Sequence, residues 1–286
     1  MQYKVSIKRK CYLLSVLLMT VWLTGCVQEE FESTPSPAGN GIRFTLTVPD
    51  VNLPSVSSRT MTGTGTAKKE DEIETVDILV FDMSKMPAVF LEWASATEVT
   101  QDLADNSTVS FSAVLSPTTA STCIVVVANK ELDGIVSGFT KGVTTKVRAM
   151  EEMLHTQTGK WLADGSTTGG YTRIPMYGEK VISKITPSMN PITDINMKRM
   201  LARIDIRNNS VTSNFTVEEV YLANYNTTGY IAPAWNTNGQ VTDPVPDTPV
   251  LPAGSGKMTE EGDAILYSVN GNTPYDGEIY TFESLA

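Results

Sequence analysis

The sequence predicts a mainly β protein of the β-sandwich class. Three observations carry this prediction. Short segments rich in β-branched and aromatic residues recur along the chain. Polar stretches rich in Gly, Pro, Ser and Thr separate them, and only one segment has the apolar spacing of a helix. Many short strands with a single helix are typical of two sheets packed face to face.

The first predicted strand is IRFTLTV, at residues 42–48. Its apolar residues alternate with polar ones and are Ile42, Phe44, Leu46 and Val48. Because successive side chains of a strand point to opposite faces, one face would be buried and the other would meet water. The soft segment SVSSRTMTGTG follows and contains Arg59.

Further strands follow in series from Glu74. The predicted strands lie at 74–82, 107–115, 122–129, 171–179, 181–187, 194–208 and 215–225. Each is rich in strand-forming residues and is bounded by turn formers. The stretch at 243–254 contains several prolines, which cannot donate to a sheet ladder, so we expect a loop there.

The one predicted helix spans residues 146–156. Its apolar face is formed by Val147, Met150, Met153 and Leu154. His155, the only histidine, would lie at the end of this helix, where the helix dipole favours a cation.

The N-terminus has the organisation of a secretory signal. Four cations, Lys4, Lys8, Arg9 and Lys10, precede an apolar run at 11–22 that is too short to span a bilayer as a mature helix. The run ends in LTGC, which looks like a bacterial lipobox. Residues 1–25 would then be removed, and Cys26 would carry the lipid (palmitate). The alternative is an ordinary signal in which Cys26 has no role.

Composition and motifs argue against several function classes. The formal net charge of −10 and the lack of a basic cluster in the mature part argue against nucleic acid as a partner. Once Cys11 is removed and Cys26 is acylated, Cys123 remains, and its apolar surroundings predict a buried thiol. No hydrolase, nucleotide-binding or zinc motif is present, so we expect no enzyme activity and no catalytic, cofactor-binding or metal-binding residues. The loop after Trp235 lacks the spaced acids of a calcium site.

A set of segments occurs in a recognisable order along the chain. They are LTGC, the first strand, SSRT, ETVDILVFD, IPMYGE, KRMLARIDI and EIYTFES. Together they resemble the fimbrillin family, lipoprotein precursors of type V pili in the major fimbrial subunit superfamily. The resemblance implies tandem transthyretin-like β-sandwich domains and a structural role. It also implies export to the outer membrane as a lipoprotein and incorporation into a cell-surface fimbrium.

The resemblance further implies a domain organisation. Residues 1–25 would be the signal peptide, 26–59 a removable lead, 60–206 the N-terminal sandwich and 207–286 a partial C-terminal sandwich. Family members continue beyond the segment that resembles EIYTFES. The chain would therefore be a fragment, or a variant that accepts a strand without donating one, with the second domain incomplete.

Maturation is implied by the same resemblance. An arginine-specific or trypsin-like protease would cut after Arg59, leaving Thr60 as the new N-terminus, whereas Arg43 lies inside the first strand. The strand carrying Ile42, Phe44, Leu46 and Val48 would then be displaced by a strand from another fimbrial subunit, which gives a head-to-tail polymer. The alternative is a lipid-anchored adhesin that is not cleaved and binds a host protein or glycan receptor. Aromatic residues that could stack on such a ligand are Trp93, Tyr171, Tyr225, Tyr230 and Trp235, although we expect most of them to be core or strand residues.

Overall fold

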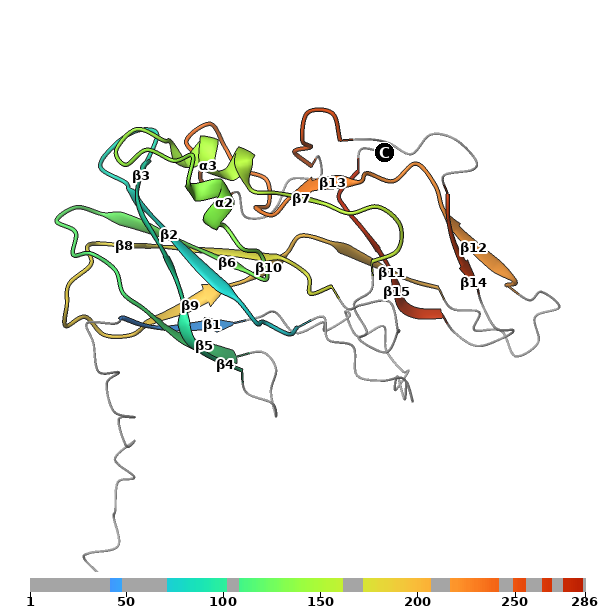
Figure 1. The fold of residues 1–286 in the computed structure, drawn as a ribbon, viewed down its shortest axis with the longest axis horizontal. Coiled ribbons are helices and arrows are strands. Elements are labelled where there is room, and N and C mark those ends of the chain that lie inside the picture. The colour runs from blue at the N-terminus through green and yellow to red at the C-terminus, as the bar shows by residue number, and fades with distance from the viewer. Residues whose placement is uncertain are drawn as a thin grey trace, which may run out of the picture. The chain divides into compact units, whose positions relative to one another are not determined.

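The computed structural model describes residues 42–47, 71–101, 108–161, 172–206, 217–241, 249–255, 264–268 and 275–284. All of them belong to one compact unit, Asn40–Ala286, and the other unit, Met1–Gly39, contains no described residue. The described part is mainly β, as the sequence predicts (Figure 1). The strands are β1 (Ile42–Thr47), β2 (Val76–Asp82), β3 (Val89–Ser95), β4 (Thr97–Gln101), β5 (Thr108–Ala113), β6 (Thr122–Ala128), β7 (Leu154–Thr156), β8 (Met176–Ile182), β9 (Ile192–Asn196), β10 (Lys198–Arg199), β11 (Ala202–Ile206), β12 (Glu219–Leu222), β13 (Thr228–Tyr230), β14 (Ile265–Ser268) and β15 (Tyr275–Thr281).

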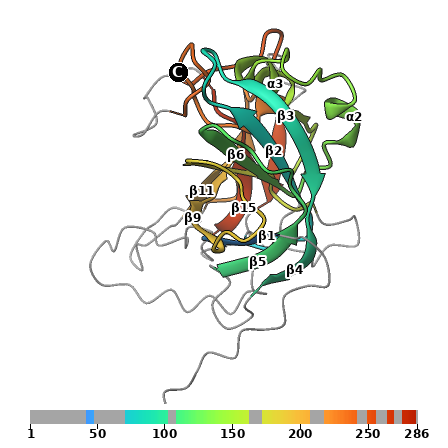
Figure 2. The same cartoon turned by 90° about the vertical axis from the view of Figure 1, so that its left-hand side faces the viewer.

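Two sheets form a sandwich. One has five strands in the order β10-β8-β6-β2-β3, and the other has four in the order β4-β5-β1-β9. Figure 2 shows β2 and β6 of the first sheet lying over β1 and β5 of the second. The apolar cluster between the sheets, here called the inter-sheet core, takes side chains from both sheets, including Phe44, Ile78, Phe111, Ile124 and Ile195. The sandwich architecture predicted from the strand pattern is therefore present.

The five-stranded sheet is covered on its other face as well. The outer core lies there and includes Phe81, Val125, Tyr177, Met150 and Phe282. The two short helices of the described residues, α2 (Asp133–Val136) and α3 (Lys146–Glu152), lie on this side, away from β1 and β5 (Figure 1). Strands β2 and β6 are thus buried on both faces, which explains their nearly continuous apolar sequences.

Smaller sheets follow. Strand β11 pairs with β15, β12 pairs with β14, and β13 pairs with β7, all antiparallel. A third cluster, in which Tyr225, Ile265, Tyr267 and Ile279 are buried, packs between the first two of these pairs. The outward cross-strand pair Tyr221 and Leu266 is exposed.

The sequence prediction of the helix is wrong in part. The predicted helix at 146–156 ends at Glu152, because Met153 adopts ψ of 77° and leaves the helical conformation. His155 therefore lies on β7, opposite Gly229 of β13, and not at a helix end.

The strand predicted at 181–187 does not exist as a separate element. Strand β8 ends at Ile182, and the backbone N–H of Ile185 donates to the hydroxyl of Thr118 (2.8 Å) instead of to a ladder. The four-residue helix α2 was not predicted. No described helix is long and apolar enough to cross a membrane.

Candidate functional site

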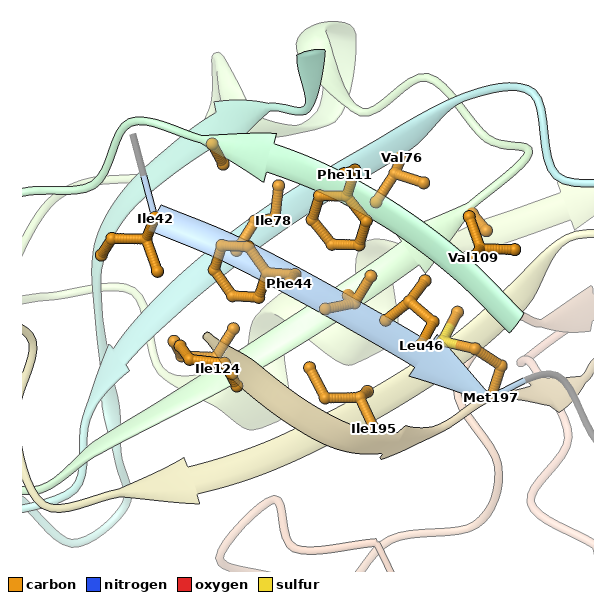
Figure 3. Packing of buried hydrophobic residues seen from close by; sticks show 14 of the residues in the cluster. Ile42, Phe44, Leu46, Val76, Ile78, Val109, Phe111, Ile124, Ile195 and Met197 are labelled. Carbon is orange, nitrogen blue, oxygen red and sulfur yellow. The ribbon is translucent and has the colours of Figure 1, made fainter. Parts of the chain in front are cut away.

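Strand β1 is an interior strand of the four-stranded sheet, although it is the first of the described strands. It pairs with β5 in the antiparallel direction and with β9 in the parallel direction. Figure 3 shows it lying between these two strands, with its apolar side chains directed into the inter-sheet core. An interior strand cannot be removed without leaving two unpaired strand edges.

The apolar face of β1 is buried almost completely. The exposed fractions are 5% for Ile42, 1% for Phe44 and 0% for Leu46. Residues of the opposite sheet, including Ile78 and Ile124, close the core over them (Figure 3). On the other face Arg43 and Thr45 are half-buried and Thr47 is exposed.

The pairing of β1 with β5 is in register along its whole length. Ile42 lies opposite Ala113, Phe44 opposite Phe111, and Leu46 opposite Val109. The rings of Phe44 and Phe111 are stacked, with centroids 4.9 Å apart and an interplanar angle of 5°. Such a buried aromatic pair adds about 0.5–1.5 kcal/mol to the contribution of burial alone.

Strand β9 depends on β1 for its place in the sheet. Among the described strands β9 pairs only with β1, and the register shifts between the Phe44–Ile192 and Leu46–Ile195 pairs. Beyond it, the Met197 N–H donates to the carbonyl of Thr47 at 2.9 Å. The chain then crosses to the five-stranded sheet, where β10 pairs with β8. Removing β1 would therefore also take away the described ladder of β9.

Most of the predicted maturation site lies outside the described residues. This is true of Cys26, Arg59, Thr60 and Val48. Of the predicted displaced strand, the other three apolar residues belong to β1, as described above. The competing arginine, Arg43, is inside the β1 ladder opposite Ser112.

The acidic segment, Asp71–Glu74, is held in place by four side chains. Arg173 pairs with Glu72 (3.3 Å) and with Glu74 (2.6 Å), and Arg199 pairs with Asp71. The side-chain oxygens of Gln101 and Asn129 accept the N–H groups of Ile73 and Glu74, and their amide groups donate to the carbonyls of Asp71 and Glu72. The chain is thus fixed just before β2.

The sequence does not reveal these ion pairs. In the sequence the acidic segment reads only as a charged lead-in to a strand, because its arginine partners lie far along the chain.

Two ionisable residues were singled out from the sequence, His155 and Cys123, and burial shifts the pKa of both. Burial lowers the pKa of His155 to about 4, and the positive charge of Lys130 adds to this shift. The imidazole is therefore neutral at pH 7 and lies beside the Trp161 ring, with centroids 5.0 Å apart. Burial raises the pKa of Cys123 to about 11, so the thiol is protonated, as expected of a structural cysteine.

Lys146 and Glu179 form an ion pair near Cys123. Lys146 is 1% exposed, its ammonium lies 2.6 Å from the Glu179 carboxylate, and the Tyr177 hydroxyl donates to the same carboxylate. Burial and the negative charge of Glu179 raise the pKa of Tyr177. Within the described residues no group of three or more His, Cys, Asp or Glu side chains is placed to hold a metal ion.

The aromatic residues predicted as adhesin contacts are largely packed inside. Tyr225 is buried, and Trp93 is half-buried against the outer core. Tyr230 and Trp235 are half-buried and pack edge to face, with centroids 4.9 Å apart. The fifth, Tyr171, lies outside the described residues. Each of the four described rings is thus buried or half-buried.

The loop after Trp235 closes on itself. The Asn236 side-chain oxygen accepts the N–H groups of Asn238 (2.9 Å) and Gln240 (3.1 Å). This oxygen is thereby engaged in the turn.

Three solved structures match over most of the chain at low sequence identity. Two of them are a fimbrial assembly protein from Parabacteroides distasonis ATCC 8503 (10% identity, 85% of this chain and 77% of that chain, TM-score 0.41) and a candidate cell adhesion protein from the same organism (14% identity, 86% and 71%, TM-score 0.46). A candidate adhesin from Bacteroides ovatus has 13% identity over 86% of this chain and 69% of that chain, with a TM-score of 0.37. No curated protein matches the sequence.

The family model described as Major fimbrial subunit protein (FimA) matches residues 42–248, well over half of the 286 residues. The match begins at the first residue of β1 and includes both sheets of the sandwich. Membership implies a non-enzymatic role in a cell-surface fimbrium, in assembly with other fimbrial subunits. The chain belongs to the major fimbrial subunit (FimA) family.

Proposed function

We propose that this protein is a pilin that is exported as a lipoprotein and assembles by exchange of β1 for a strand of another subunit. The observation that carries the proposal is the position of β1. It is the first strand among the described residues, yet it occupies an interior place in the sheet with its apolar face buried. The connection from β1 to β2 spans residues 48–75 and contains Arg59. A cut in this connection leaves β1 held only by noncovalent contacts.

The energy of β1 burial explains why cleavage must be followed by replacement. Burying Ile42, Phe44 and Leu46 contributes about 1.5–3 kcal/mol each. Their sum is comparable to the whole stability of an ordinary domain, about 5–15 kcal/mol. The ladder of β9 would be lost together with this burial. A vacant site is therefore strongly unfavourable, and a strand from a second subunit restores both the burial and the hydrogen bonds.

The remaining steps follow from the N-terminal sequence. Lipidation of Cys26 anchors the precursor in the outer membrane. An arginine-specific or trypsin-like protease cuts after Arg59, so that Thr60 becomes the N-terminus and residues 26–59 can leave. Because a strand of one subunit would fill the β1 site of the next, the contact is head to tail and produces a filament.

The acidic segment supports this division of the chain. Its contacts with Arg173, Arg199, Gln101 and Asn129 fix the backbone immediately before β2. They lie on the C-terminal side of the proposed cut and do not involve β1. The rest of the sandwich therefore keeps its own N-terminal attachment after the lead has been removed.

The proposal is tested by blocking the cut in cells that make the fimbrium. We expect the Arg59→Gln precursor to remain lipid-anchored and outside the polymer, while the matched Arg43→Gln variant is processed and assembled. Electron microscopy and membrane fractionation measure the two outcomes. Normal assembly of Arg59→Gln would contradict the proposal. Receptor binding by the uncleaved, anchored protein would favour the adhesin alternative.

A further inference from the structure

We propose that Phe111 sets the register of the strand that occupies the β1 site, and that it selects a strand with an aromatic side chain at the Phe44 position. This inference rests on the proposed strand exchange. It adds the chemistry of the partner: a strand of another fimbrial subunit whose inward face reads apolar, aromatic, apolar.

The alternation of β1 excludes only some of the wrong registers. A shift by one residue would turn Ile42, Phe44 and Leu46 to the outside and bury polar residues, which is costly. A shift by two residues keeps every apolar side chain inside. Polarity therefore cannot distinguish the correct register from a shift by two, and a difference in side-chain size or shape has to do so.

The inward face of β5 provides this difference. It presents Val109, Phe111 and Ala113 to the inter-sheet core, so a single aromatic ring lies between two smaller side chains. Phe44 and Phe111 are also the two aromatic residues among the described members of this core. After a shift by two, Phe44 would lie opposite Val109 or Ala113, and the stacked pair would be lost.

The residues around the Phe44–Phe111 pair are completely buried, which leaves little space for a strand in a shifted register. Residues Leu46, Ile78, Val109, Ile124 and Ile195 around the pair are all 0% exposed. On the other side of β1, the pairing with β9 is irregular between Phe44 and Leu46, so β9 does not supply a continuous ladder. The regular pairing is with β5, and its central pair is Phe44 with Phe111 (Figure 3).

The selection can be measured with peptides that compete for the site. The protein is the full-length chain with Phe44→Ala, which weakens its own strand, cut after Arg59 by limited trypsin treatment. Ile42→Ala can replace this variant if it aggregates. The probes are fluorescent peptides with the sequence of residues 41–48, which have Phe, Leu or Ala at the position of Phe44. By anisotropy we expect the Phe peptide to bind roughly tenfold more tightly than the Leu peptide, since a stacked ring pair adds to burial. This preference should disappear when Phe111→Leu is added, and should persist with the control Phe90→Leu, a buried ring of the outer core.

The register can be measured by disulfide trapping. Thr45 lies opposite Ser110. In a chain with Cys11→Ser and Cys26→Ser, a peptide with cysteine at the position of Thr45 should therefore form a disulfide with the Ser110→Cys chain. It should not do so with the Ser112→Cys chain. Residues directly opposite in a ladder are close enough for this bond, whereas a neighbour two positions away is not. With Phe111→Leu, both chains should be trapped.

The outcomes separate this inference from the proposed function. Equal binding of the Phe and Leu peptides, or trapping at both positions with Phe111 intact, would leave strand exchange in place and overturn the role of Phe111. Failure of every peptide to bind the chain that has been cut after Arg59 would overturn the exchange itself. Since the peptide comparison needs only one variant of β1, the inference remains testable if Phe111→Leu does not fold.

Discussion

Truncation of Phe44 is the perturbation that best measures how much β1 holds the precursor together. The side chain is 1% exposed and is stacked on Phe111 in a core closed by both sheets. Replacing a buried Phe by Ala costs about 3–5 kcal/mol, because burial is lost and a cavity remains. Since the site is enclosed and one ring of a stacked pair would remain, we expect a value in this range for Phe44→Ala. That is a large part of a typical domain stability of about 5–15 kcal/mol.

Equilibrium unfolding in urea measures this cost in the uncleaved precursor. The matched control is Thr47→Ala, which removes an exposed side chain of the same strand and should change the free energy of unfolding by about 0.5 kcal/mol or less. Hydrogen exchange gives a second measurement. Because β9 pairs only with β1 among the described strands, amide protection at 192–196 should fall in Phe44→Ala and not in Thr47→Ala. An unfolding midpoint for Phe44→Ala as high as that of the control would refute the argument that β1 is a major source of stability.

Three further predictions concern individual side chains. Cys26→Ala should leave the precursor in the soluble fraction, and unchanged membrane fractionation would exclude the lipid anchor. Cys123 should not react with a thiol reagent at pH 8 in the folded protein and should react fully in the unfolded protein. The reason is that its pKa of about 11 keeps the thiol protonated and its burial keeps the reagent out. Rapid labelling of Cys123 in the native state would contradict this. NMR should show His155 titrating near pH 4, below the ordinary histidine pKa of 6.5. Between pH 4 and 6.5 the folded protein therefore binds fewer protons than the unfolded chain, so its stability decreases as the pH falls through this range. His155→Gln should flatten that part of the pH profile, and an unchanged slope would assign it to other groups.

Local sequence patterns predict well those strands of the sandwich that are buried on one face or on both faces. The alternation in IRFTLTV identifies β1 because one of its faces is buried and the other is not. The nearly continuous apolar runs in β2 and β6 are recognisable because both faces are covered. In contrast, β3 and β4 were missed, since Glu92 and Glu98 lie within stretches that are only partly buried.

The misplaced histidine has a different cause. Leu154 and Met153 continue the apolar spacing of α3, but the backbone turns at Met153 and pairs Leu154 with Tyr230. The preference for this pairing comes from residues far along the chain, and the periodicity of a short segment cannot contain it. Tertiary contacts override local propensity at such positions.

The candidate site, too, could be predicted from the sequence only in part. The sequence predicts that β1 is half-buried, but not that it lies between β5 and β9 or that Phe44 meets Phe111. Nor does it show that β9 depends on β1. These relationships are nonlocal, because β9 lies far from β1 along the chain and pairs with it in parallel.

The central claim is that β1 can be replaced by a strand from another subunit after a cut at Arg59. Its most direct test is mass spectrometry of the folded precursor after limited trypsin treatment and incubation with an isotopically labelled peptide of residues 41–48. The account predicts a first cut after Arg59, retention of residues 26–59 in the nicked protein without peptide, and replacement of this lead by the peptide when it is added. A first cut at Arg43, or a nicked protein that keeps its lead and excludes the peptide at every concentration, would contradict the account.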